Sequence, residues 1–129
     1  MQFDKDMNSA QAELFLDVRA FIIKHIEKAR LTAVERYTAN ITSYYSQEHD
    51  GGFCYIKTKG DYVHIGWFHG VNLKDRNKLL LGNGKILKGQ KITQLDKFQK
   101  NSIKSFIEQT QVLLIEKSEK KKIKKSLKK

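Results

Sequence analysis

The first strong pattern along the chain is helical and lies between Ser9 and Ala29. Apolar side chains recur there at steps of three and four residues, whereas charged side chains take the opposite positions. The sequence therefore predicts a long amphipathic helix with one buried face, capped at its start by Asn8 or Ser9. The buried positions are Leu14, Phe15, Val18, Phe21, Ile22, His25, Ile26 and Ala29.

A second helical signal follows at Thr32. A glutamate, Glu35, stands three residues after this threonine, which fits a capping box, so we expect a short helix from Ala33 to Ala39. The period then changes. Residues 41–45 are rich in β-branched and aromatic side chains and predict a strand.

Two further strands are predicted at residues 53–58 and 62–68, as a hairpin closed by a glycine turn. In the second of them Val63, Ile65 and Trp67 share one face, because successive side chains of a strand alternate. The other face also carries large side chains. We therefore expect that face to be covered in part.

The last third of the chain predicts three more elements. Residues 75–81 fit two helical turns, which Gly82 would end in the left-handed cap position. Residues 87–92 predict a fourth, short strand. A final helix opens at residues 93–96 with an acidic residue in its first turn, and its buried stripe runs to Leu114.

The order of these elements indicates an α+β fold, with an antiparallel sheet of about four strands packed against N- and C-terminal helices. We expect one domain over residues 1–116 and a lysine-rich tail over residues 117–129. The tail holds eight lysines against one glutamate, so it carries +7 of the net charge of +11 and leaves the folded body only mildly basic. It either extends the last helix into solvent or is disordered.

Composition points to a soluble protein of a reducing compartment. The chain is 40% hydrophobic and 30% charged, as globular proteins are, and no apolar run approaches the length of a membrane span. The acidic start does not resemble a secretory signal. The single cysteine, Cys54, is expected to be a buried strand residue, and a cytoplasmic location is the simplest interpretation.

The most specific string is the turn Gly82-Asn83-Gly84-Lys85. Glycines at this spacing expose backbone amides, and the lysine adds positive charge, so the turn is a candidate anion site. It is not a phosphate-binding P-loop, because its glycines are too close together and no Ser or Thr follows the lysine. A helix cap followed by a tight turn explains the same residues and is the favoured interpretation.

This string resembles that of the YdhG-like family, small bacterial proteins that form a domain of unknown function, some of them described as frataxin-like intracellular iron chaperones. The resemblance covers residues 10–115. It implies a small α+β domain with a groove near the turn and a non-enzymatic binding or carrier role, with iron as the suggested cargo. The matching positions are Leu73, Asp75, Leu79, Leu80, Gly82, Gly84, Lys85 and Lys88, with Glu35 and Tyr44 upstream.

The resemblance makes Trp67, Asp75, Gly82, Gly84, Lys85 and Lys88 the candidate ligand-binding residues. The chain departs from the family at three places. Arg76 and Thr42 stand where the family has proline, and Lys88-Gly89 stands where it has Arg-His. Any activity that depends on that Arg-His pair is not expected here.

The metal-ligating residue types do not cluster in the sequence. Iron prefers carboxylates and imidazoles close together, and Glu48-His49-Asp50 is the one dense group. A solvated turn is the favoured interpretation of that group, so His49 and Asp50 are only weak metal candidates. His64 and His69 are five residues apart and would point to opposite faces of a regular strand. The residues themselves name no cofactor.

Aromatic residues crowd the predicted hairpin and allow two interpretations. They form either a stacking platform for bases or part of the core between sheet and helices, and the core is favoured. No nucleophile motif and no Glu-x-x-His motif is present, which disfavours an enzyme. The cluster comprises Phe53, Tyr55, Tyr62, Trp67 and Phe68.

The lysine-rich tail offers an alternative function, that of an accessory protein that binds nucleic acid electrostatically. Such a tail would also attract anionic lipid, and it also serves as a solvated tail without any partner. The candidate nucleic-acid contacts are Lys120, Lys121, Lys122, Lys124, Lys125, Lys128 and Lys129.

Overall fold

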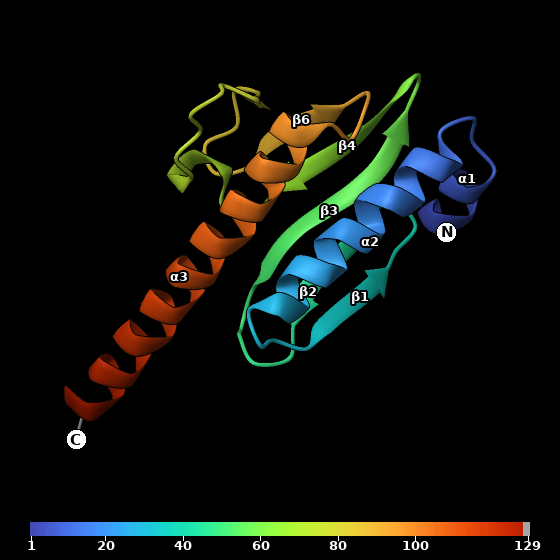
Figure 1. The fold of residues 1–129 in the computed structure, drawn as a ribbon. Helices are drawn as coiled ribbons and strands as arrows, with labels where there is room; N and C mark the ends of the chain where they lie inside the picture. Colours follow the sequence, from blue (N-terminus) through green and yellow to red (C-terminus); the bar gives the residue numbers. More distant parts are fainter. Residues whose placement is uncertain (128–129) are drawn as a thin grey trace.

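The computed structural model describes residues 1–127 of the chain. Within them six strands form one antiparallel sheet in the order β1-β2-β3-β4-β6-β5, accompanied by three α-helices and one 3-10 turn, η1 (Figure 1). The elements in chain order are α1 (Gln2–Met7), α2 (Ala12–Lys28), β1 (Ala33–Tyr37), β2 (Thr42–Ser46), β3 (Gly52–Lys59), β4 (Tyr62–Trp67), η1 (Gly70–Asn72), β5 (Leu80–Leu81), β6 (Lys88–Ile92) and α3 (Lys97–Leu127). The α+β class is confirmed.

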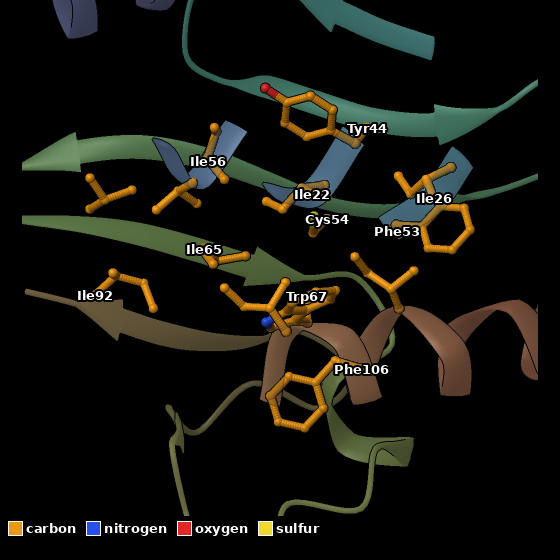
Figure 2. Packing of buried hydrophobic residues seen from close by; sticks show 14 of the residues in the cluster. Ile22, Ile26, Tyr44, Phe53, Cys54, Ile56, Ile65, Trp67, Ile92 and Phe106 are labelled. Carbon is orange, nitrogen blue, oxygen red and sulfur yellow. The ribbon is translucent and has the colours of Figure 1, made fainter. Parts of the chain in front are cut away.

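Both long helices lie against one face of the sheet, here called the inner face (Figure 1). The predicted alternation in β4 is confirmed, since Val63, Ile65 and Trp67 are fully buried on this face. Figure 2 shows Trp67 close to Phe106 of α3; their ring centroids are 5.4 Å apart in an edge-to-face arrangement. Burial of side chains of this size contributes about 1.5–3 kcal/mol each, so this layer is the main source of stability. The helix side chains of the core are Phe15, Val18, Ile22, Ile26, Ile103, Phe106, Ile107 and Leu114.

The prediction of a short helix at Ala33–Ala39 is wrong, because residues 33–37 form the edge strand β1. The capping box does not form. Glu35 Oε2 instead accepts hydrogen bonds from Arg19 Nε at 2.6 Å and from the Tyr44 hydroxyl at 2.7 Å. The amide of Thr32, the expected cap, donates to Glu48 Oε1 at 2.7 Å. Both halves of the local motif are therefore engaged by residues distant in sequence.

The two helical turns expected before Gly82 are also wrong. Both carboxylate oxygens of Asp75 accept backbone amides, from Leu79 at 2.9 Å and from Leu80 at 2.7 Å, and so hold a loop closed. Leu80 and Leu81 then pair with β6 as the short edge strand β5. Together with β1, this strand raises the number of strands from the expected four or so to six.

The ends of the long helices differ slightly from expectation. α2 begins at Ala12, and Ser9 Oγ accepts the amide of Gln11 in the preceding turn instead of capping the helix. Asp96 Oδ1 accepts the amide of Gln99 at 2.9 Å, and α3 runs from there to Leu127. Of the two descriptions left open for the tail, the helical extension is the one the structure has over the described residues. Lys128 and Lys129 lie outside them.

None of the helices within residues 1–127 combines the length and apolar character needed to cross a bilayer.

Candidate functional site

The outer face of the sheet, turned away from both long helices in Figure 1, carries a different population of side chains. Alternation along each strand assigns every second residue to it. Its aromatic residues are half-buried, whereas Tyr44, Phe53 and Trp67 of the inner face are fully buried. The outer set is Val34, Arg36, Ser43, Tyr45, Tyr55, Lys57, Lys59, Tyr62, His64, Leu81 and Lys91, with Gly52, Gly66 and Gly89 between them.

The glycines of the outer face leave room for aromatic rings from neighbouring strands. A Cβ atom added to Gly66 would overlap the Tyr55 ring, which comes from the directly opposed residue of β3. One added to Gly89 would lie 2.5 Å from the His64 ring. One added to Gly52 would lie 2.8 Å from both Tyr45 and Phe68. The rings therefore lie down over the backbone of the sheet, in space that any larger residue would fill.

Four of these rings form a continuous row across the outer face, here called the aromatic row: Tyr45, Phe68, Tyr55 and His64. Successive ring centroids are 6.1, 5.9 and 5.5 Å apart, with interplanar angles of 37°, 41° and 48°. The Tyr55 hydroxyl and His64 Nε2 are 3.1 Å apart and share a hydrogen bond. The row thus presents neighbouring, mutually tilted rings along the sheet.

The titration state of the row follows from burial. Burial lowers the pKa of His64, and the nearby Lys59 and Lys57 lower it further. Burial also raises the pKa of Tyr55. At neutral pH both side chains are therefore uncharged, and the His64 ring acts as a neutral aromatic surface.

Four cations surround the aromatic row. The Arg36 guanidinium lies 3.9 Å from the centroid of the Tyr45 ring, and Lys91 Nζ lies 4.6 Å from that of Tyr62, both in cation–π geometry. Lys57 and Lys59 stand on the same face of β3. Among the outward positions of the six described strands there is no carboxylate, since Glu35 points inward. The outer face is therefore both aromatic and positively charged.

A hollow of about 460 Å³ opens at the β5 side of the outer face. Its strand side is formed by the rings of Tyr55, Tyr62 and His64, and its other side by Leu81 and the loop that follows β5. Lys59 and Lys91 stand at its margin, and the loop contributes Gly82, Gly84 and Leu87. The glycine turn singled out from the sequence thus lies beside the aromatic residues.

The other residues expected at the glycine turn do not gather around this hollow. Trp67 is fully buried on the inner face, where its Nε1 donates to Gln90 Oε1 at 3.0 Å. Asp75 is engaged with two loop amides. Lys88 Nζ donates to the carbonyl of Gly82 at 3.1 Å and so ties the turn to β6, and Lys85 is exposed. Of the six candidates, the structure brings only Gly82 and Gly84 to the hollow.

The two weak metal candidates, His49 and Asp50, do not form a metal site in the structure. Asp50 Oδ2 forms an ion pair with Lys121 Nζ at 2.9 Å on the surface. His49 Nε2 is buried without a hydrogen-bond partner among the described residues. Within residues 1–127, no three His, Cys, Asp or Glu side chains come together in a way that could hold a metal ion. Cys54 is fully buried, as expected, and burial holds the pKa of its thiol well above its usual range.

The described lysines of the tail project from the exposed last turns of α3. Lys121 meets Asp50 in the turn before β3, and Lys122 lies 3.5 Å from Glu119 of its own helix. The turn before β3 leads into Gly52, at the Tyr45 and Phe68 end of the aromatic row. Lys120, Lys124 and Lys125 add further exposed charge to the same helix.

Sequence reasoning found only part of the outer face. It placed Tyr55, Tyr62 and Phe68 in one cluster with Trp67 and Phe53, which the structure divides between the two faces. Tyr45 and His64 were not included in that aromatic cluster. The available signal was the strand glycines, because a glycine opposite an aromatic residue marks a ring that lies flat on the sheet.

No family model, curated protein or solved structure matches this chain. The YdhG-like resemblance therefore stays a prediction from the residues that carry it.

Proposed function

We propose that this protein binds single-stranded nucleic acid on the outer face of its sheet, with bases stacked on the aromatic row and phosphates beside the surrounding cations. The observation that carries the proposal is the row of four half-buried rings on a face with four cations and no outward carboxylate. Stacking platforms within a positive groove are the general chemistry of single-strand binding.

Single strands fit this surface better than a duplex does. Base stacking on protein rings requires unpaired bases whose π faces are free, and a duplex already stacks them internally. The rings lie along the sheet instead of projecting from it, since glycines lie beneath them. Such a surface offers faces to stack on and no protruding element to enter a groove.

The lysines at the end of α3 add a second, unspecific contribution. They stand on the helix that meets the turn before β3, so a strand that leaves the Tyr45 end of the row would run toward them. In this proposal the tail and the outer face of the sheet contact the same strand. It extends the alternative function expected from the tail alone.

The iron-carrier role implied by the family resemblance gains no support from the described residues. It would need a cluster of hard ligands, and none forms among residues 1–127. The outer face is cationic, which disfavours the capture of a metal cation.

A fluorescence anisotropy titration with labelled twelve-nucleotide strands, thymidine DNA and uridine RNA, tests the proposal. The double variant Tyr55→Leu/Phe68→Leu keeps apolar bulk on the sheet but removes two ring faces. Base–aromatic stacking is worth roughly 1–3 kcal/mol per base, so we expect affinity to fall at least thirtyfold. A matching duplex should bind more weakly than either strand.

The matched control is Phe98→Leu, which alters an aromatic residue of α3 that is 67% exposed and lies away from the outer face. It should leave affinity unchanged. Equal losses in the control and the double variant, or unaltered binding by the double variant with its melting temperature preserved, would contradict the proposal.

A further inference from the structure

The hollow beside β5 is lined by side chains of the sheet together with residues of β5 and the loop that follows it, and so differs from the aromatic row. Rings border it on the sheet side, and the apolar residues Leu81 and Leu87 line it as well. Its volume of about 460 Å³ lies in the range of small-molecule sites, roughly 300–1,000 Å³. The aromatic row offers ring faces of the sheet alone, whereas this hollow also offers Leu81, Leu87 and the glycine turn as contact surface.

The chemistry of the walls selects an aromatic heterocycle with an attached anion. Tyr62 and the neutral His64 supply ring surfaces, and His64 Nε2 is already bonded to the Tyr55 hydroxyl. Lys59 and Lys91 are also lining residues, Lys91 with its Nζ 4.6 Å from the centroid of the Tyr62 ring, and no carboxylate is among the lining residues. The rings and leucines complement a nucleobase, and the two lysines complement a phosphate linked to it.

We infer that the hollow is a nucleotide subsite, in which one base of a bound strand enters between Tyr62 and Leu81 and its phosphate lies beside Lys59 and Lys91. This inference rests on the proposed function and deepens it. It turns an otherwise sequence-tolerant surface into one with a fixed position, because one base would be held on both sides. The glycine turn then acts as the wall of that subsite.

The shape of the glycine turn depends on a close approach between Gly84 and the backbone of Leu87. A Cβ atom added to Gly84 would lie 2.5 Å from the carbonyl oxygen of Leu87. Lys88 Nζ, bonded to the carbonyl of Gly82, ties the start of the turn to β6. The wall opposite Tyr62 is therefore held in place by backbone packing and one side-chain hydrogen bond.

An NMR titration of the isotope-labelled full chain with AMP tests the inference. We expect amide shifts that saturate in the millimolar range and centre on Tyr62, His64 and residues 81–87. Adenosine should shift the same amides more weakly, because it lacks the phosphate. Inorganic phosphate and ribose 5-phosphate should leave the amides of Tyr62 and His64 unmoved.

Two variants locate the subsite. Leu81→Trp places a large ring where a side chain that is 59% exposed now lines the hollow, and it should abolish the AMP shifts. The same variant should weaken twelve-nucleotide binding only about tenfold, since the aromatic row is intact. Tyr62→Leu should weaken AMP binding at least fivefold, and Phe98→Leu should not alter it.

The outcomes separate this inference from the proposed function. Strand binding that depends on Tyr55 and Phe68, without AMP binding, overturns the subsite and leaves the proposed function standing. Shifts by AMP that match those of inorganic phosphate, or that survive Leu81→Trp, overturn the subsite as well. AMP binding in the hollow without binding of either strand overturns both the strand surface and the inference built on it.

Discussion

The two faces of this sheet are built from the same strands, yet their side chains are packed in different ways. On the inner face, aliphatic and aromatic side chains stand upright and are covered by α2 and α3 (Figure 2). Some buried polar side chains there are paired, as in the chain from Trp67 through Gln90 to Gln99, whereas the hydroxyls of Thr42 and Ser46 have no hydrogen-bond partner among the described residues. On the outer face, rings lie over glycines and shield the backbone without any helix above them.

This difference separates stability from surface chemistry. A ring that lies flat over a glycine buries one of its faces and leaves the other in solvent, whereas an upright inner side chain has no exposed face. The inner layer therefore contributes most of the free energy of unfolding. The outer layer contributes less to folding and is available for binding, which makes the comparison testable by paired substitutions.

The largest effect is expected from Trp67→Ala on the inner face. Loss of this fully buried ring would leave a cavity against Phe106 and remove the hydrogen-bond donor to Gln90 Oε1, and should cost about 3–5 kcal/mol of unfolding free energy. Tyr55→Leu on the outer face should cost less than half of that. Urea denaturation followed by circular dichroism measures both, and equal losses would show that the two faces do not differ in this way.

A smaller effect is expected from Gly66→Ala. The added methyl group would force the Tyr55 ring away from the sheet, and overpacking of this kind typically costs about 1–3 kcal/mol. Displacement of the ring should also weaken strand binding, although no ring is removed. In the Tyr55→Leu background the same substitution should cost clearly less. A double-mutant cycle from denaturation curves measures this coupling, and additive losses would separate Gly66 from the ring.

The inner face was the more predictable of the two. The helical period of α2 and the alternation in β4 report burial directly, because each depends only on nearby residues and one covered side. The wrong predictions came where partners distant in sequence decided the outcome. Glu35 lies in strand β1, where Arg19 and Tyr44 donate hydrogen bonds to its carboxylate. Asp75 lies in a loop, which is held closed by two backbone amides that donate to its carboxylate oxygens.

The outer face was less predictable for a related reason. A flat ring needs a glycine on the neighbouring strand, so the signal exists only once the register is known. The pair of Tyr55 and Gly66 is invisible until β3 and β4 are aligned. The glycine turn was recognised as special from its own residues, but its position beside Tyr62 depends on the short strand β5.

A third prediction compares cations of the two sides of the molecule. Lys57→Gln/Lys91→Gln removes two charges of the outer face, whereas Lys100→Gln/Lys104→Gln removes two exposed charges of α3. Each phosphate contact to a single strand contributes about 0.7 to the slope of log K against log salt, so the first pair should reduce that slope by about 1.4. The second pair should barely alter it. Equal reductions would indicate unspecific attraction by net charge.

The smallest effect concerns pH and compares His64 of the outer face with His25 of α2. Burial lowers the pKa of both, and nearby lysines add to the effect. An imidazole of the unfolded chain binds its proton near about pH 6.5, whereas these do so only at lower pH in the folded protein. Between those values the unfolded state binds more protons, so stability should fall as the pH is lowered from 7 toward 5.

The carboxylate of Glu35 does not contribute to the decline in this window. Burial raises its pKa, but hydrogen bonds from Arg19, Tyr37 and Tyr44 outweigh that effect and lower it. Its contribution to stability is therefore lost only near and below pH 4.5. His64→Gln and His25→Gln should each flatten the decline in melting temperature between pH 7 and 5. Around His64 stand the Tyr55 hydroxyl, Lys57, Lys59 and Lys91, with no carboxylate among them, so a proton on this ring would gain no ion pair. A decline that persists unchanged in the His64 variant would place the outer imidazole in solvent, and the aromatic row would then end at Tyr55.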